Sequence, residues 1–414
     1  MSIRNSFLFV YLLQFCFAIL LKYLSFLGDT STETHEAILK YFTEEDLQKG
    51  IEYDRRGFFA SMVSDWIDFF LTGLLVFTPL SLKIEDFLLR KTGQRFYFAA
   101  ALFLLALGFF KFLIGLPFHY YFGYVLEHRF GFSTMTLQDW ILYTTKSLFV
   151  GTAISLPLGL GSIFILRKFT SSWKYIITAG SLVLGLAFSV LFPIFITPLF
   201  YETHPIEEGS LKSKIVDLCR KAEIQVSDVY VINESKYSGH TNAYFTGWGA
   251  NRKIFLYDTL IQKHTEAEVI SVLGHEIGHW VHNHQTKDIL IGTAETFLLC
   301  FVLAFLFRKT KEENRLPLKE FYSPSSLPFL FLVLSLVGTV TKPVWNTLSR
   351  IQETQADWEA LVLTKDKEAF VEAEKKLAKD NRSRLNPYRW EVLLEHSHPT
   401  TLERIQMAEG FSSK

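Results

Sequence analysis

The chain has 414 residues with 42 basic and 42 acidic side chains, so its formal net charge is zero and its composition offers no electrostatic basis for binding nucleic acid. Apolar residues make up 49% of the chain and charged residues 20%, with a mean hydropathy of +0.19, which indicates a membrane protein and disfavours a soluble enzyme or a disordered chain. The spacing of Cys16, Cys219 and Cys300 fits neither a metal-binding motif nor a secreted disulfide framework.

Seven segments of the sequence are long enough and apolar enough to cross a membrane. A span needs about 20 mostly apolar residues, because the hydrocarbon core is about 30 Å thick and an α-helix rises about 1.5 Å per residue. The first segment lacks the small-residue cleavage signal of a secretory peptide and six others follow it, so we interpret it as a membrane anchor. The predicted spans are Ser6–Leu27, Phe58–Leu82, Phe96–Tyr121, Ser147–Leu166, Tyr175–Tyr201, Asp288–Phe307 and Phe321–Thr341.

Several of these spans contain charged residues, which are costly at mid-bilayer and normally face protein or water rather than lipid. Asp65 and Asp68 lie on one face of the second span, and Lys111 and Glu295 lie within the third and the sixth. Lys146 directly precedes the fourth span. Two interpretations fit these positions: the charges pair and hold the helices together, or they line a water-filled space between the helices.

The order of the segments divides the chain into four regions. Five predicted spans occupy residues 1–201, and a hydrophilic insert follows at residues 202–285. A hairpin of two more spans covers residues 286–346, and a polar C-terminal segment covers residues 347–414. We therefore expect an all-α membrane protein that carries a small α+β domain.

The insert has the pattern of a small sheet followed by a helix. Val229–Ile232 and Lys253–Tyr257 are short apolar or alternating runs typical of strands, and Asn242–Thr246 fits a third strand. Gly247–Arg252, with two glycines, predicts a turn. A helix is predicted over Glu266–His284, with a capping box at its start.

This helix contains the sequence HEIGH, an HExxH motif. His275 and His279 are four residues apart on one helical face, so both imidazoles can bind one Zn²⁺ ion. Glu276 is then placed to accept a proton from a metal-bound water. A surface helix with two exposed histidines is the structural alternative. His282 and His284 are out of register with His275, so we expect them at an interface or in solvent rather than on the metal.

A catalytic zinc ion usually has three protein ligands and one open position. The candidate third ligand is Glu353, although it lies far along the chain from His279. The predicted hairpin explains this separation, because it returns to the membrane face that it left. His279 lies about 13 Å of helix before the sixth span and Glu353 about 18 Å after the seventh, so both residues are expected at a similar height above the membrane. Asp357, on the same helical face as Glu353, can orient a ligand histidine. Without the HExxH motif, a solvated acidic face would be the preferred interpretation of both carboxylates.

Together these motifs resemble those of the type I CAAX prenyl proteases, also called a-factor-converting enzymes, which are integral-membrane zinc metallopeptidases. The similarity covers most of the chain and is densest from Phe192 to Arg404. Six blocks occur in the family's order: Phe192-Pro193 with Pro198-Leu199-Phe200, SGHTNAYFTG at 238–247, KIFLYDTL at 253–260, HEIGHW at 275–280, SRIQETQAD at 349–357 and HSHPTTLERI at 396–405.

The resemblance implies seven transmembrane helices around an intramembrane chamber, with a gluzincin-type zinc site at one end. Carried over by position, His275, His279 and Glu353 are ligands of one zinc ion. Glu276 is the general base of the reaction.

The resemblance also implies roles for residues outside this group. Asn242, Ala243 and Tyr244 belong to an edge strand that receives the substrate as an added strand, as extended peptides do on exposed sheet edges. His398 contacts the substrate, where it can hydrogen-bond the oxyanion of the tetrahedral intermediate. Arg404 anchors neighbouring carboxylates.

The expected partners are membrane lipids and a peptide or lipidated CAAX protein substrate, without nucleic acid, and the sequence leaves the oligomeric state open. The expected location is the endoplasmic reticulum membrane in a eukaryote or the inner membrane in a bacterium. Two other functions fit parts of the pattern. One is a broader quality-control metalloprotease with the same zinc core, and the other is a transporter or channel with a vestigial zinc site.

Two features of the sequence give opposite predictions for the side of the membrane on which the zinc site lies. Basic residues cluster in Lys83–Arg95, Arg167–Lys174 and Arg308–Lys319, and the positive-inside rule places these in the cytoplasm and the zinc site opposite. The resemblance implies catalysis on the cytosolic side. We follow the resemblance, because buried spans and long loops weaken the charge rule.

Overall fold

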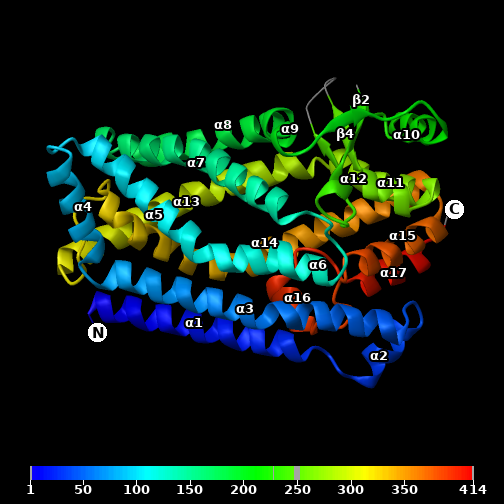
Figure 1. The fold of residues 1–414 in the computed structure, drawn as a ribbon, viewed down its shortest axis with the longest axis horizontal. Helices are drawn as coiled ribbons and strands as arrows, with labels where there is room; N and C mark the ends of the chain where they lie inside the picture. The colour runs from blue at the N-terminus through cyan, green and yellow to red at the C-terminus, as the bar shows by residue number, and fades with distance from the viewer. Residues whose placement is uncertain (1, 227, 247–251, 413–414) are drawn as a thin grey trace.

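The protein is elongated, and most of its helices run along the longest axis (Figure 1). The computed structural model describes residues 2–226, 228–246 and 252–412. Within these residues, seven helical segments are long and apolar enough to cross a membrane, in agreement with the seven predicted spans. They are Ile3–Leu27, Glu44–Phe77, Phe96–Arg129, Leu137–Lys168, Trp173–Phe200, His284–Glu313 and Pro324–Thr364.

Most spans belong to helices longer than predicted, because hydropathy marks only the part of a helix that contacts lipid. The clearest case is α14 (Leu327–Thr364), a helix of 38 residues in which the predicted last span continues without a break into SRIQETQAD. The other helices of the spans are α1 (Ile3–Leu27), α3 (Glu44–Phe77), α5 (Phe96–Tyr120) with η1 (Tyr121–Leu126) and α6 (Glu127–Arg129), α7 (Leu137–Lys168), α8 (Trp173–Leu191) with η2 (Phe192–Ile196) and α9 (Thr197–Phe200), and α13 (His284–Glu313).

The second predicted span, Phe58–Leu82, was wrong at its C-terminal end. Its helix begins earlier, at Glu44, behind a capping box that the apolar pattern does not reveal. It ends at Phe77, because Pro79 has no N–H group to continue the hydrogen bonding, and α4 (Leu80–Lys91) starts directly after it.

The aspartates of the second span pair with lysines of neighbouring helices. Asp65 lies 2.5 Å from Nζ of Lys22, and Asp68 lies 3.5 Å from Nζ of Lys111. All four side chains also line a cavity of about 720 Å³, to which α1, α3, α5 and α14 contribute. The interpretation that the charges pair is therefore confirmed for these four residues, which also border a cavity between the helices.

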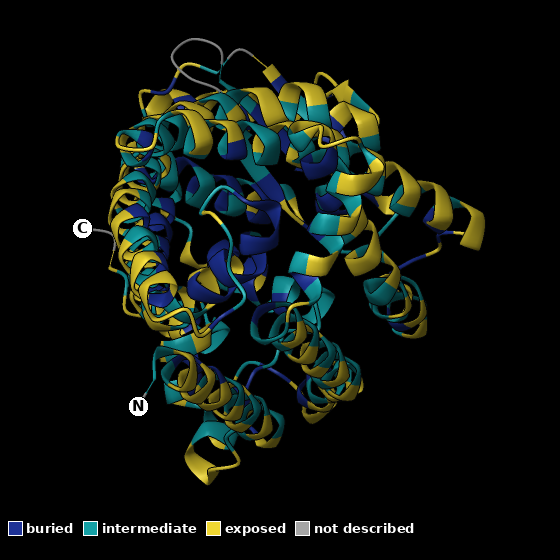
Figure 2. Ribbon diagram, turned by 90° about the vertical axis from the view of Figure 1, so that its left-hand side faces the viewer, coloured by how far each residue is buried: buried dark blue, intermediate teal, exposed yellow. Residues whose placement is uncertain are grey.

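The spans pack loosely against one another. In the most apolar window of each of the first six, between 6% and 17% of the residues are buried, so most side chains there keep part of their surface uncovered by the rest of the chain. Seen along the helix axes, the outer helices consist mainly of exposed and intermediate residues, and the buried residues lie toward the centre (Figure 2). Single contacts bridge neighbouring helices: Lys146 donates to the carbonyl oxygen of Leu199, and Glu295 accepts from the indole N–H of Trp345, both at 2.7 Å.

The insert forms a mixed sheet, which in the described residues has four strands in the order β1-β2-β4-β3. The strands are β1 (Thr203–Pro205), β2 (Asp228–Ile232), β3 (Ala243–Thr246) and β4 (Lys253–Tyr257). β2 and β4 are parallel, and β1 and β3 are antiparallel to their neighbours, which leaves β3 at an edge. The three predicted strands are confirmed, whereas β1 is too short to detect by pattern. Apart from Arg252, the predicted turn at 247–252 lies outside the described residues.

The sheet packs against α12 (Glu266–Val281), which carries the HExxH motif. Ile277 of this helix and Leu256 of β4 are fully buried in the same apolar core. The predicted capping box is confirmed at its start. The predicted end at His284 was wrong: Asn283 adopts a left-handed conformation (φ 55°) and separates α12 from α13.

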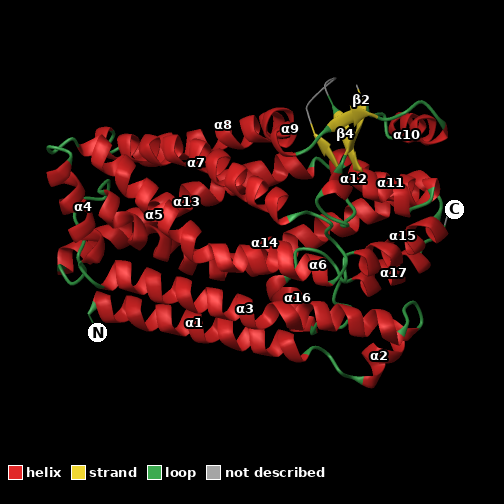
Figure 3. Ribbon diagram, in the orientation of Figure 1, coloured by secondary structure: helices red, strands yellow, loops and turns green. Residues whose placement is uncertain are grey.

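Most of the helices outside the membrane spans lie at the same end of the molecule as the sheet, at the right of Figure 1. Figure 3 shows how small the sheet is relative to the helical part of the molecule. The three basic segments lie at the opposite end, near α4. The remaining elements are α2 (Thr32–Leu39), α10 (Ser210–Lys221), η3 (Glu234–Lys236), α11 (Asp258–Lys263), η4 (Pro324–Ser326), α15 (Lys367–Asp380), α16 (Arg389–Glu395) and α17 (Thr401–Glu409).

Candidate metal centre

A close crossing of α12 and α14 assembles the site. Gly274 and Gly278 of α12 face Ala360 and Ala356 of α14. A Cβ atom at Gly278 would lie 2.7 Å from the Cα atom of Ala356, and one at Gly274 would lie 3.1 Å from the Cα atom of Ala360. Glycine at these two positions therefore permits the approach. Glu353, about one turn before Ala356, is thereby brought to the HExxH helix.

His275, His279 and Glu353 bring three potential ligand atoms together. These atoms all lie within 4.8 Å of one another. Nε2 of His275 is 3.1 Å from Nε2 of His279, and the Glu353 carboxylate is 3.3 Å from the first nitrogen and 3.6 Å from the second. The Glu353 side chain is 9% exposed and that of His279 is 26% exposed, so the group is enclosed except on the His279 side.

The surrounding contacts leave these atoms available to a cation. Nδ1 of His275 is 2.6 Å from a carboxylate oxygen of Asp357, which places the ring proton on Nδ1 and a lone pair on Nε2. Nδ1 of His279 is likewise engaged, 2.9 Å from Nδ1 of His284. Oε2 of Glu353 is buried and accepts no hydrogen bond from the described residues.

The spacing also suits zinc. A tetrahedral Zn²⁺ ion with Zn–N bonds of about 2.0–2.1 Å holds its nitrogen ligands about 3.3 Å apart. The two Nε2 atoms are 3.1 Å apart, a separation at which two lone pairs repel unless a cation lies between them. Two imidazoles and one carboxylate therefore fit this metal, with one coordination position left open.

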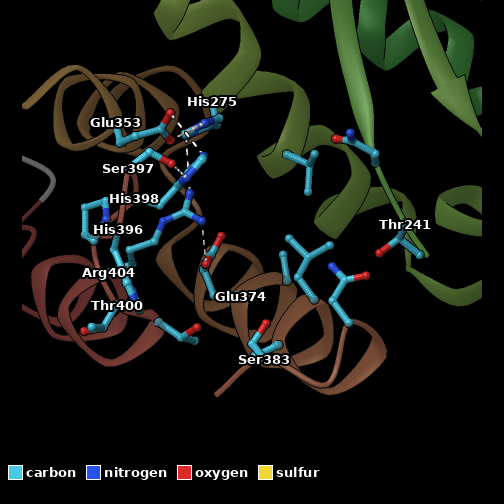
Figure 4. Close-up of a pocket in the computed structure, with 18 of the residues that line it drawn as sticks. Thr241, His275, Glu353, Glu374, Ser383, His396, Ser397, His398, Thr400 and Arg404 are labelled. Atoms are coloured by element: carbon cyan, nitrogen blue, oxygen red, sulfur yellow. Dashed lines mark hydrogen bonds and ion pairs between the residues drawn. The ribbon is translucent and has the colours of Figure 1, made fainter. Parts of the chain in front are cut away.

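Asp357 and Arg404 support His275 from behind. Asp357 is 1% exposed, and Nε of Arg404 donates to its Oδ2 atom at 2.8 Å. Arg404 also pairs with Glu374 at 2.8 Å (Figure 4). Burial raises the pKa of the Glu374 carboxyl, to about 6, although the Arg404 guanidinium opposes this effect. Two carboxylates thus surround the guanidinium, and one of them also holds the His275 ring.

Glu276 lies beside the ligand group without joining it. It lines both a cavity of about 670 Å³ that includes His275 and a second cavity, of about 470 Å³, that includes His279. Burial raises the pKa of the Glu276 carboxyl to about 7, an effect opposed by His275 and increased by Glu353. A carboxyl group with this pKa can accept and release a proton at neutral pH.

His398 approaches the group from the segment that precedes α17. Its Nε2 atom is 3.4 Å from Oε1 of Glu353, and its Nδ1 atom is 2.9 Å from Oγ of Ser397. Its side chain is 62% exposed, so it can contact a molecule in the larger cavity. His398 lies beside Glu353 and His275 on one side of this cavity, with Thr241 on the other (Figure 4).

The predicted substrate strand borders the same cavity. Asn242, directly before β3, lines it together with His275 and Glu276. Ala243 is buried in the core of the insert, and Tyr244 points to the other face of the sheet, where its ring stacks on a phenylalanine. Of the three predicted strand residues, Asn242 is therefore the one whose side chain reaches the cavity.

We expected His284 to lie at an interface or in solvent, and solvent was wrong. His284 is 2% exposed and lies between His279 and Gln355, at 2.9 Å and 3.0 Å. The error arose because α12 was extended through this residue, whereas the break at Asn283 turns His284 back toward the site. The spacing of the histidines holds no signal for this contact. His282, the other histidine outside the register, is partly exposed, at 34%.

Family models match nearly the whole chain. The model described as peptidase family M48 matches residues 188–412. The model described as the CAAX prenyl protease N-terminal region, with five membrane helices, matches residues 23–202.

Individual proteins show the same similarity. CAAX prenyl protease 1 of Saccharomyces cerevisiae is 32% identical over 320 residues, which cover 73% of this chain and 70% of the yeast protein. The metalloprotease YhfN of Bacillus subtilis is 29% identical over 358 residues, which cover 85% of this chain and 82% of YhfN. The crystal structure of Ste24p from S. mikatae matches with a TM-score of 0.86 at 26% identity and covers 99% of both chains.

Proposed function

The chain belongs to peptidase family M48 and to the CAAX prenyl protease 1 group within it, and from this premise we propose that it removes C-terminal residues from prenylated CAAX proteins. It is a multi-pass membrane metalloprotease. The metal that the donor set supports is zinc. The observation that carries the proposal is the convergence of His275, His279 and Glu353 beside the carboxyl group of Glu276.

Each residue of this site has a separate role in peptide hydrolysis. His275, His279 and Glu353 would hold a zinc ion, which would polarise the scissile carbonyl as a Lewis acid and lower the pKa of the attacking water. Glu276 accepts the proton of that water and later delivers it to the leaving amine, as its raised pKa allows. His398, the exposed imidazole at the cavity, donates a hydrogen bond to the oxygen that becomes negative.

The substrate peptide pairs with the free edge of β3. Asn242, directly before β3, lines the cavity that contains His275 and Glu276, and Phe245 of β3 lines the second cavity, which contains Glu276 and His279. A peptide added to this edge therefore passes in front of the metal group. Its backbone completes hydrogen bonds that an edge strand leaves unpaired, which aligns the peptide without reading its sequence. Asp357 acts by holding His275, and Arg404 acts by holding Asp357.

The first test is Glu276→Gln. The amide cannot accept the proton, so kcat is expected to fall by about 10²–10⁴-fold while zinc content is unchanged. Cleavage and zinc content are measured on the detergent-solubilised full-length protein. Glu207→Gln, at an exposed carboxylate of the insert, is the matched control. Undiminished turnover by the Glu276 variant would contradict the mechanism.

The second test concerns the substrate. A farnesylated CAAX peptide and its unlipidated counterpart are supplied at equal concentrations, and kcat/KM is expected to be higher for the lipidated peptide. Equal cleavage of both, together with cleavage of unrelated membrane segments, would support a quality-control protease instead. A purified protein without bound zinc would favour the transporter or channel.

A further inference from the structure

The two imidazoles of the metal group have different partners. Nδ1 of His275 contacts the carboxylate of Asp357, whereas Nδ1 of His279 contacts the ring nitrogen Nδ1 of His284 at 2.9 Å. Nε2 of His284 is in turn 3.0 Å from Oε1 of Gln355. A chain of contacts therefore runs from Gln355 on α14, through His284 at the start of α13, to His279 on α12.

The chemistry of these groups assigns one proton to each contact. Nε2 of His279 faces the metal group, so it offers a lone pair to a bound ion, and the neutral ring then carries its proton on Nδ1. That proton bonds to His284 only if Nδ1 of His284 is unprotonated. The proton of the neutral His284 ring is then on Nε2, where the side-chain oxygen of Gln355 accepts it. Every donor has one acceptor, and no additional charge is buried.

Packing holds His284 in this orientation. Its ring is 2% exposed, lies edge-on to His279 with centroids 5.0 Å apart, and stacks on His282 at 5.5 Å. The left-handed Asn283 makes this possible, because it ends α12 and redirects the chain within one residue. His284 is not itself a member of the metal group, whose atoms come from the two histidines of HExxH and from Glu353.

We propose that His284 is a positioning residue for the metal. It accepts the Nδ1 proton of His279, fixes the tautomer and rotation of that ring and thereby tightens zinc binding, and Gln355 fixes His284 in the same way. This inference rests on the metal site of the proposed function. Partners that orient metal ligands typically change metal affinity by about 10–100-fold.

The test compares variants that keep or remove the acceptor. His284→Phe keeps the ring shape without the acceptor, so zinc affinity is expected to fall by about 10–100-fold. His284→Asn places an amide oxygen near the position of Nδ1 and is expected to recover most of that loss. His204→Phe, at an exposed histidine of β1, is the control and is expected to bind zinc as the unsubstituted protein does. Zinc affinity is measured by competition with a chelator on the full-length protein in detergent.

A second pair of variants decides the outcome if His284→Phe does not fold. Gln355→Leu removes the acceptor of the His284 proton and is expected to weaken zinc binding, whereas Gln355→Glu keeps an acceptor and preserves it. The melting temperature of the metal-free protein shows whether a variant alters the fold instead of the metal site.

The role of His284 would be overturned if His284→Phe left zinc affinity unchanged or, where that variant does not fold, if Gln355→Leu did so. It would also be overturned if His284→Asn lost as much zinc affinity as His284→Phe. Absence of zinc binding by the unsubstituted protein would instead overturn the proposed function, and this inference with it.

Discussion

At the scale of single residues, exposure separates the proposed metal ligands from the residue that is proposed to contact the substrate. His275, His279 and Glu353 have side chains between 9% and 26% exposed, whereas His398 is 62% exposed although it lies 3.4 Å from Glu353. A ligand gains from enclosure, because surrounding groups fix its orientation. A group that stabilises charge on a substrate has to remain accessible to it.

This difference predicts the effect of His398→Ala. Loss of one hydrogen-bond donor to the oxyanion is expected to lower kcat by about 10²–10³-fold, with KM and zinc content nearly unchanged. Steady-state kinetics and metal analysis on the same preparation measure these quantities. His204→Ala, at an exposed histidine of β1, serves as the control. Loss of zinc from the His398 variant would assign it to the metal group instead.

At the scale of elements, the crossing of α12 and α14 matters more than either helix alone. The HExxH helix supplies two of the proposed ligands, but Glu353 reaches them only because Gly278 lets the helices approach. The space at this crossing is smaller than one methyl group, since a Cβ atom would meet the Ala356 backbone at 2.7 Å.

Gly278→Ala is therefore expected to impair the site although Gly278 binds nothing. An alanine in place of a helical glycine normally adds about 0.5–1 kcal/mol of stability, but overpacking here costs about 1–3 kcal/mol and moves Glu353 away from the histidines. Zinc affinity and melting temperature should both fall. Gly292→Ala, in α13, is the matched control, because an added Cβ atom meets nothing within 4 Å there. Equal behaviour of the two variants would show that the close approach has no role.

At the scale of the whole molecule, His240 joins the membrane helices to the catalytic end. Its Nε2 atom is 3.1 Å from Glu127 at the end of the third span, and its Nδ1 atom is 2.9 Å from the side-chain oxygen of Asn381 after α15. Tyr53 of α3 donates to the same Glu127 at 2.8 Å. Both ring nitrogens face oxygen atoms, so the charged form of His240, with two N–H donors, fits this junction.

This junction predicts a pH dependence of stability. The hydrogen bond with Glu127 raises the pKa of His240 above its ordinary value of 6.5, although burial opposes the shift. A raised pKa in the folded state means that the stabilisation is complete below pH 6.5 and is lost as pH rises through the raised value. Hydrogen bonds to charged groups contribute about 1.5–3 kcal/mol when buried, and less at His240, whose side chain is 35% exposed.

Glu127→Gln tests this prediction. The variant is expected to melt at a lower temperature than the unsubstituted protein at pH 6, and the difference is expected to shrink as pH rises. Melting curves of both proteins across pH 6–9 provide the comparison. Two parallel curves would mean that the charge on His240 does not contribute to the junction.

Features that depend only on residues close together in the sequence could be predicted from the sequence. The seven spans follow from about 20 consecutive apolar residues each, and the start of α12 follows from a capping box. The ends of elements were less predictable. The apolar pattern stops where lipid contact stops, so it missed the extension of α14 from the membrane into the site.

The sequence by itself determined that two imidazoles and a carboxyl group occupy one turn of helix, because the i, i+4 geometry is local and needs no other part of the chain. Only the tertiary structure decided that Glu353 lies 3.3 Å and 3.6 Å from the two imidazoles, that Arg404 lies between Asp357 and Glu374, and that His284 contacts His279. These contacts depend on the approach of separate helices and on one left-handed residue, neither of which leaves a periodic trace in the sequence.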